Sequence, residues 1–445
     1  MSDTARSDLS ALKATASSAL ETARKLGATQ AEVSTSRGAG LSVTVRMRDV
    51  ETLEYHRDQG MSVTVYFGQQ KGSASTSDLD PGAVEESVGK ACSLARYAAE
   101  DPFAGLAAPE RMAAGQADLD LYHPWEMEPA QAIELALSCE AAGLDFDPSI
   151  TNSEGATVST HEGVRVYGNS HGFLAGYPSS QHSLSCAVLA SAGGPMERDF
   201  EYSVARRSED LLAPELIGAE AARRATRRLG ARKLDTATVP VLYPARLARG
   251  LFGHLIGAIS GGNLYRKASF LTDAMDKKIF AEAISIVEQP HIPRALSSAP
   301  FDDEGVATLD RTLVEDGHLR GFVLGSYYAR KLGLESTANA GGIHNLVVSN
   351  TGEDFDQLLA GLDRGLLVTE LMGQGVNTLT GDYSRGATGF WVERGEIQFP
   401  VSEITVAGNL ADMYQQIRAV GNDVDRRGGI RTGSVLVDGM TVAGN

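Results

Sequence analysis

The chain has 445 residues, of which 42% are hydrophobic and 22% are charged. These values are typical of folded globular proteins, and a chain of this length is expected to divide into two or three domains. The formal net charge of −17 argues against general binding to nucleic acid or to anionic membranes, because both attract basic surfaces.

The first part of the chain is predicted to combine helices with antiparallel strands. A helix is expected from about Asp8 to Leu26, because apolar residues recur along one face and Gly27 follows them. Alternating apolar and polar residues predict strands at 41–45 and 61–65, with the charged stretch 46–58 between them. A second helix is expected after these strands.

The same order of elements recurs in the next part of the chain. Pro129 opens a predicted helix, residues 151–205 alternate as expected of an antiparallel meander, and a closing helix follows. We therefore expect an N-terminal α+β domain over residues 1–232. The repeated order also suggests an internal duplication into 1–115 and 120–232, although the residue identities of the two parts do not match.

The C-terminal part, residues 238–445, is predicted to be mainly β. A strand at 239–243 and a helix that begins at Pro244 are followed by short apolar runs bounded by glycines. The fold class expected for the whole chain is therefore α+β, with a helix and meander domain followed by a sheet-rich C-terminal domain.

Composition and local patterns indicate a cytoplasmic protein. The three cysteines form no ligand-spaced pair, and an odd count fits a reducing compartment better than a disulfide framework. The polar N-terminus shows no signal-peptide pattern, and the most apolar helical stretch, 247–259, is too short for a membrane span of ~20 residues. One basic run falls at helical spacing and is expected to form a solvated helix face; it comprises Arg223, Arg224, Arg227, Arg228, Arg232 and Lys233.

Two short motifs suggest catalysis but have simpler interpretations. The segment Gly168-Asn-Ser-His-Gly172 matches the G-x-S-x-G pattern of a nucleophile elbow, but no helix follows it, so a hairpin turn is expected. His161-Glu162 begins like the zinc motif H-E-x-x-H, but Arg165 replaces the second histidine, and a turn between strands is expected. None of the nine histidines lies three or four residues from another, so no helix presents a histidine pair.

The strongest functional signal is a set of longer segments, densest in the C-terminal part of the chain. These segments are 243–262, 265–267, 300–306, 329–333, 341–345, 369–376, 381–386, 389–391, 400–405, 408–409 and 420–423. They resemble the TldD/PmbA family of bacterial metalloproteases, and in particular its TldE (PmbA) type of chain.

The resemblance implies that the metal belongs to another chain. In this family a TldD-type chain binds Zn through an H-E-x-x-x-H helix and a cysteine near its C-terminus, with the glutamate as general base. When 265–267 is aligned with TldD-type chains, Gly253 and Ala258 replace the two histidines and His254 replaces the glutamate. The region of the cysteine corresponds to about 429–434, which contains none. The resemblance therefore implies no catalytic residue, metal or cofactor in this chain, with Zn expected in a TldD-type partner.

Polar residues in the most family-specific segments are candidates for a substrate cleft or a subunit contact. They are His254, Arg266, His344, Gln374, Asp382, Tyr383 and Arg385. A structural role within the fold is the alternative for each of them. His254, for example, fits equally well on a helix face beside Leu251 and Leu255.

The function expected from the resemblance is that of a non-catalytic subunit that forms a heterodimer with a TldD-type chain. Such a complex would act on unfolded peptides, as in peptide antibiotic (microcin) maturation and antitoxin degradation, and a homodimer is expected to be possible without the partner. Two alternatives stay open. One is a homodimeric metallopeptidase with a different site that uses His254, His318 or His344, and the other is a protein-binding modulator without protease activity.

Overall fold

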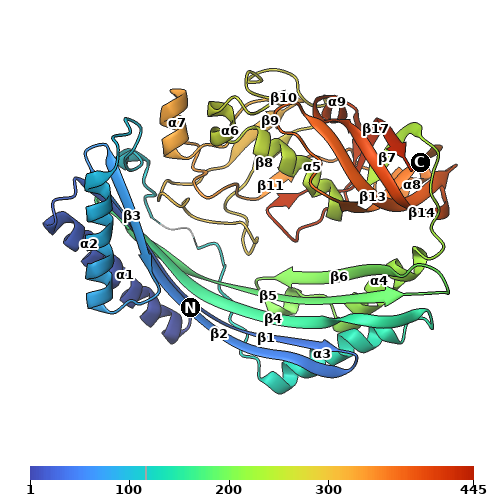
Figure 1. Cartoon of the computed structure of the whole chain (residues 1–445), viewed down its shortest axis with the longest axis horizontal. Coiled ribbons are helices and arrows are strands. Elements are labelled where there is room, and N and C mark those ends of the chain that lie inside the picture. Colours follow the sequence, from blue (N-terminus) through green and yellow to red (C-terminus); the bar gives the residue numbers. More distant parts are fainter. Residues whose placement is uncertain (116–117, 445) are drawn as a thin grey trace.

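The computed structural model describes residues 1–115 and 118–444. Its N-terminal half is one six-stranded antiparallel sheet with four helices on the outer face (Figure 1). The elements are α1 (Asp3–Lys25), β1 (Gln30–Arg46), β2 (Asp49–Phe67), β3 (Gln70–Thr76), α2 (Pro81–Tyr97), α3 (Pro129–Leu144), β4 (Ile150–Asn169), β5 (Leu174–Ala190), β6 (Glu197–Ala205) and α4 (Pro214–Arg227). The order of a helix, antiparallel strands and a helix occurs twice along this half.

The two repeats meet at the centre of the sheet. The strand order is β3-β2-β1-β4-β5-β6, so β1 of the first repeat pairs with β4 of the second. Alternate residues of β1 point to the outer face, where Val33 packs with α1 and α2 and Val43 packs with α3 and α4. These two apolar clusters bury the outer face, and the concave face of the sheet lies toward the C-terminal half (Figure 1).

The charged stretch 46–58 is not the connection that the sequence predicts. β1 and β2 continue to a two-residue turn at Met47 and Arg48, whose φ angles are 50° and 67°. Tight hairpin turns of this kind usually carry Asn or Gly, so no turn signal is visible in the sequence. The turn is held instead by the buried Glu140, whose carboxylate accepts hydrogen bonds of 2.8 Å from both backbone N–H groups.

The two catalysis-like motifs lie in the same sheet. The hairpin turn predicted at 168–172 is confirmed, and Ser170 Oγ accepts a hydrogen bond of 3.1 Å from the Ala31 N–H group. His161 does not lie in a turn as predicted, because β4 continues through it and pairs with β1 and β5 on either side. β5, rather than a helix, follows Gly172, so the nucleophile-elbow geometry is not formed there.

The C-terminal half contains two sheets and five short helices. Its elements are β7 (Ala237–Tyr243), α5 (Ala245–Ala258), α6 (Gly261–Tyr265), β8 (Ile286–Glu288), β9 (Arg311–Glu315), β10 (His318–Leu319), α7 (Ser326–Leu332), β11 (Leu346–Val348), α8 (Phe355–Ala360), β12 (Arg364–Met372), β13 (Asp382–Glu393), β14 (Glu396–Asn409), α9 (Leu410–Gln415), β15 (Ile417–Val420), β16 (Ile430–Arg431) and β17 (Val435–Ala443). One sheet has the order β10-β9-β8-β11-β16, and the other has the order β14-β13-β12-β7-β17-β15. β14 also pairs with β17, so five strands of the second sheet close on themselves.

Arginines join the two halves of the molecule. Arg330 of α7 donates hydrogen bonds of 2.7 to 3.0 Å to three carbonyl groups of the segment 103–106. Arg165 of β4 forms an ion pair of 2.6 Å with Asp303. Such pairs place the C-terminal half over the concave face of the N-terminal sheet (Figure 1). No helix in the described ranges is long and apolar enough to cross a membrane.

Candidate functional site

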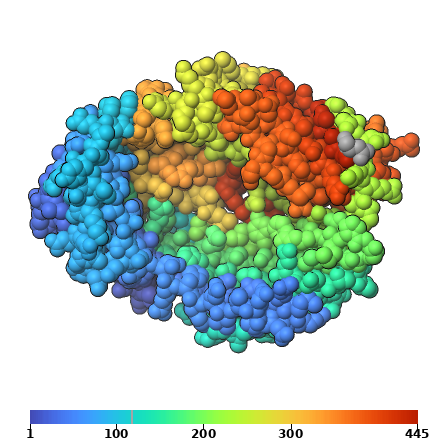
Figure 2. Space-filling view, viewed as in Figure 1, coloured from blue at the N-terminus to red at the C-terminus, as the bar shows by residue number. Residues whose placement is uncertain are grey.

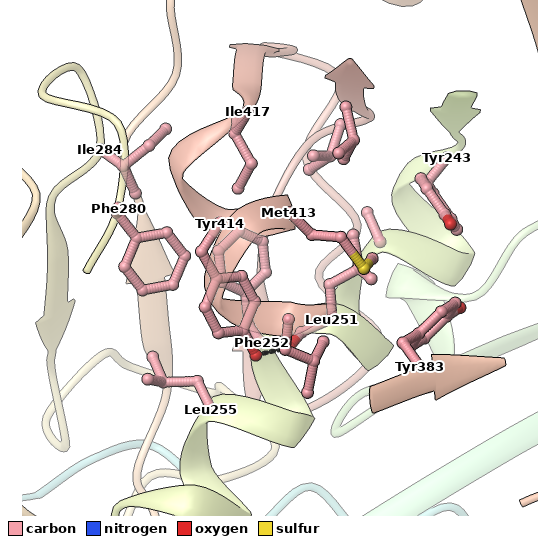
Figure 3. Packing of buried hydrophobic residues seen from close by; sticks show 14 of the residues in the cluster. Tyr243, Leu251, Phe252, Leu255, Phe280, Ile284, Tyr383, Met413, Tyr414 and Ile417 are labelled. Carbon is pink, nitrogen blue, oxygen red and sulfur yellow. Dashed lines mark hydrogen bonds between the residues drawn. The ribbon is translucent and has the colours of Figure 1, made fainter. Parts of the chain in front are cut away.

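Helix α5 carries His254 and is fixed by the C-terminal core. Leu251 and Leu255, which flank His254, are buried in that core. The Tyr414 hydroxyl group donates a hydrogen bond of 2.9 Å to the Leu251 carbonyl, and its ring stacks on Phe280 with centroids 4.4 Å apart (Figure 3). His254 therefore projects from a helix whose position is set by buried aromatic contacts.

His254, Tyr383 and Arg385 come together beside this helix. The half-buried His254 ring meets the edge of the Tyr383 ring at 6.0 Å between centroids and an angle of 73°. Burial lowers the pKa of His254, and the positive charge of Arg385 lowers it further. Burial raises the pKa of Tyr383, whose side chain is almost inaccessible. The site therefore presents a neutral imidazole beside a cation and a neutral phenol.

The loop that follows β12 lies next to this group. Arg385 donates a hydrogen bond of 3.1 Å from Nε to the carbonyl of Met372, the last residue of β12, which ties β13 to the start of that loop. Gln374 is exposed in this loop. Asp382 is exposed at the start of β13, and its carboxylate accepts a hydrogen bond of 2.6 Å from Thr380 Oγ1. Four of the seven candidate residues, Gln374, Asp382, Tyr383 and Arg385, thus belong to one strand and its adjoining loop.

The other candidates lie apart from this group. Arg266 is exposed after α6 and donates a hydrogen bond of 3.0 Å to Asn263. His344 is buried, and its backbone N–H group donates a hydrogen bond of 2.6 Å to the carboxylate of Glu288. Burial tends to raise the pKa of Glu288, but the hydrogen bonds from His344 and the charge of Arg311 outweigh it and the net pKa is lowered. These contacts give His344 a structural role.

The residues aligned with the zinc ligands do not fit a metal. The Cβ of a side chain at Gly253 would lie 4.0 Å from Ile430 Cδ1, so two of the three aligned regions do meet beside α5. Ala258 is fully buried in the core on another face of the helix. Neither Gly253 nor Ala258 carries a donor atom, the segment 429–434 contains no cysteine, and His254 is the one histidine on this helix. Within residues 1–115 and 118–444, no three His, Cys, Asp or Glu side chains gather as a metal-binding group.

The basic run on α4 is only partly solvated, which corrects the sequence-based expectation. Arg228 is 9% exposed and contacts three carboxylates, including Asp199 at 3.3 Å and Glu370 at 2.8 Å. Arg224 forms an ion pair of 2.6 Å with the buried Glu201. Acidic residues of β6 and β12 turn these two arginines inward, and helical spacing alone does not reveal such tertiary partners.

A cavity of about 620 Å³ lies between α4, the first turn of α5 and the segment 423–427, a volume typical of ligand pockets. Arg227 and Arg426 line it together with the apolar rings of Phe355 and Phe390. Figure 2 shows the molecule hollowed between its blue-to-green N-terminal half and its orange-to-red C-terminal half. In the sequence, the basic run that ends α4 is the one pattern that indicates this cavity, because several of its arginines line it.

Three family models together cover most of the chain. The PmbA/TldA metallopeptidase domain 1 matches residues 31–95, the central domain matches 122–229, and the C-terminal domain matches 236–444. The chain belongs to the PmbA/TldD family. Its resemblance to that family, predicted from the sequence, is thereby confirmed.

Within the PmbA/TldD family the chain is of the PmbA type. It is 51% identical to the metalloprotease PmbA of Escherichia coli O157:H7 over 93% of this chain and 92% of that protein. It is 22% identical to a metalloprotease TldD homologue of Buchnera aphidicola over 83% of this chain and 80% of that protein. The chain is far more similar to the PmbA-type relative than to the TldD-type relative, so it groups with the PmbA-type chains.

Solved structures share the PmbA/TldD fold over nearly the whole chain. A candidate modulator of DNA gyrase from Bacteroides thetaiotaomicron superposes with a TM-score of 0.93 at 29% identity, covering 97% of this chain and 99% of that one. TldE from Thermococcus kodakarensis superposes with a TM-score of 0.85 at 21% identity, covering 96% and 99%. The α+β fold predicted from the sequence is confirmed.

Proposed function

We propose that this chain is the metal-free, non-catalytic subunit of a cytoplasmic TldD-type metallopeptidase and that it completes a cleft for unfolded peptides. The observation that carries the proposal is the donor set beside α5. Gly253 and Ala258 stand where the family resemblance places the two histidine ligands, neither has a donor atom, and the aligned segment 429–434 contains no cysteine. The 51% identity to a protein named metalloprotease PmbA and the similarity to TldD homologues support a role beside a metal-holding chain.

In this proposal the zinc of the TldD-type chain supplies the activated water and polarises the peptide carbonyl. The residues of the present chain bind and orient the peptide. The His254 side chain contacts the Tyr383 ring and forms no side-chain hydrogen bond within the described ranges, so its ring nitrogens are available to a peptide main chain. Main-chain hydrogen bonds of this kind would hold an extended peptide with little regard to its side chains.

Metal content and complex formation test the proposal together. This chain, a TldD-type chain and their mixture are separated by gel filtration, and zinc is measured in each fraction. We expect one complex that contains both chains, with zinc in proportion to the TldD-type chain and none retained by the present chain alone. A TldD-type chain without its two motif histidines is the control, and it should still form the complex but lose the zinc. Stoichiometric zinc on the isolated chain would overturn the proposal.

A further inference from the structure

The cavity between α4, the first turn of α5 and the segment 423–427 is positively charged, although the chain as a whole has a net charge of −17. The described residues that line it include seven arginines and five acidic residues. Two of these arginines, Arg227 and Arg426, form no ion pair within residues 1–115 and 118–444. The other five pair with carboxylates: Arg223, Arg224, Arg228, Arg246 and Arg427.

The acidic side chains of the cavity are already engaged by other groups. Three of them pair with arginines of the same cavity: Asp199, Glu220 and Asp425. Asp423 accepts hydrogen bonds of 2.9 and 2.6 Å from the backbone N–H group and the hydroxyl group of Ser434. Asp210 lies 3.5 Å from the guanidinium group of Arg207. The positive charge of the two unpaired arginines is therefore left for a ligand.

The surroundings of the two unpaired arginines disfavour their charge. Burial lowers the pKa of Arg227 and the charge of Arg223 lowers it further, while Glu220 offsets only part of this effect. Burial likewise lowers the pKa of Arg431, and the charge of Arg426 adds to the effect. An anion in the cavity would relieve this repulsion and would accept charge-assisted hydrogen bonds from the guanidinium groups.

Apolar side chains form another wall of the cavity. The guanidinium carbon of Arg227 lies 4.9 Å from the centroid of the Phe390 ring. Such a contact uses the face of the guanidinium group and leaves N–H groups at its edge for a ligand. The half-buried Phe355, at the start of α8, and Leu367 of β12 also line the cavity. The cavity therefore fits a ligand that has both an anionic and an apolar group.

We propose that this cavity binds the C-terminal residue of a peptide, whose carboxylate is held by Arg227 and Arg426 and whose apolar side chain packs against Phe355 and Phe390. The acidic residues that also line the cavity favour a singly charged carboxylate, because they would repel a doubly charged phosphate more strongly. The proposal rests on the proposed function for its ligand, an unfolded peptide. It adds that the peptide is selected by its free C-terminal end.

Calorimetric titration of the isolated full-length chain tests this site. The probe is an acetylated alanine–phenylalanine dipeptide with a free C-terminal carboxylate, compared with its C-terminal amide and with the acid that ends in glycine. The phenylalanine acid should bind about tenfold more tightly than its amide, and also more tightly than the glycine acid. The measurement needs neither zinc nor a TldD-type chain, so a failure here is distinct from a failure of the proposed function.

Substitutions assign the binding to the two arginines. Arg227→Gln and Arg426→Gln should each weaken binding of the acid about tenfold and leave binding of the amide unchanged. Arg232→Gln is the matched control, because Arg232 lies 4.8 Å from the Phe399 ring centroid but does not line the cavity. It should not change the affinity.

Four results would overturn the proposal. They are no measurable binding of the acid, equal binding of acid and amide, equal effects of the control and the two cavity substitutions, and displacement of the acid by an equal concentration of inorganic phosphate. The last result would assign the cavity to phosphate. Circular dichroism of each variant separates loss of binding from loss of folding.

Discussion

At the scale of single residues, His254 is held in its neutral form by its surroundings. Burial and the charge of Arg385 both disfavour the imidazolium ion, so the pKa of His254 is lowered. The ring therefore binds its proton more weakly in the folded protein than in the unfolded chain. The contribution of His254 to the free energy of unfolding is therefore complete above the ordinary histidine pKa of about 6.5. It is lost as the pH falls below that value, because the unfolded chain then binds the proton more readily.

Substitution Arg385→Gln should raise the pKa of His254. Removal of the neighbouring positive charge leaves burial as the main cause of the shift, so the pKa should rise but remain below about 6.5. NMR titration of the ring protons measures this value. Arg266→Gln is the control, because Arg266 is exposed and bonded to Asn263. An unchanged His254 pKa in Arg385→Gln would contradict the described contact.

The candidate residues group together in the structure where neighbours in the chain are also neighbours in space. Tyr383 and Arg385 lie two apart on β13 and share one site, so their grouping follows from a strand pattern. His344 belongs to an equally family-specific segment, but its bond to Glu288 joins residues far apart in the chain and makes it structural. Such a partner cannot be read from the local sequence.

At the scale of elements, Arg228, the residue that caps the C-terminus of α4, closes the edge of β6. This side chain is 9% exposed and meets several carboxylates, so its loss would leave buried negative charges unpaired. We expect Arg228→Met to lower the free energy of unfolding by about 3–5 kcal/mol. Urea denaturation followed by tryptophan fluorescence measures the change.

Arg223→Gln is the comparison for that substitution. Arg223 lies on the same helix and pairs with Glu220, but its side chain is 45% exposed. Solvent screens such a pair, so its loss should cost no more than about 1 kcal/mol. Equal effects of the two substitutions would mean that the buried pairs of Arg228 do not stabilise the edge.

Most helices and strands follow from apolar periodicity and turn residues, and the exceptions share one cause. The turn at Met47 and Arg48 lacks the usual Asn or Gly, because the carboxylate of Glu140 stabilises it from another element. The inward turn of Arg224 and Arg228 depends in the same way on acids of β6 and β12. Long-range polar partners, rather than local propensity, decide these positions.

At the scale of the whole molecule, the repeated order of helix, meander and helix is visible in the sequence but its assembly is not. Pairing of β1 with β4 joins both repeats into one sheet, and that register is set by residues more than a hundred positions apart. The cavity lined by Arg227 and Arg426 likewise forms only when the two halves meet. The family resemblance supplies the expectation of a two-chain enzyme, which periodicity and composition cannot.

The central claim is that this chain supports peptide cleavage without performing it. Cleavage of an unstructured peptide is measured with this chain alone, with a TldD-type chain alone and with their equimolar mixture, each with and without a chelator. We predict activity in the mixture that the chelator removes, and none from this chain alone. Chelator-sensitive cleavage by the isolated chain would contradict the account, because it would require a metal site that the residues beside α5 do not provide.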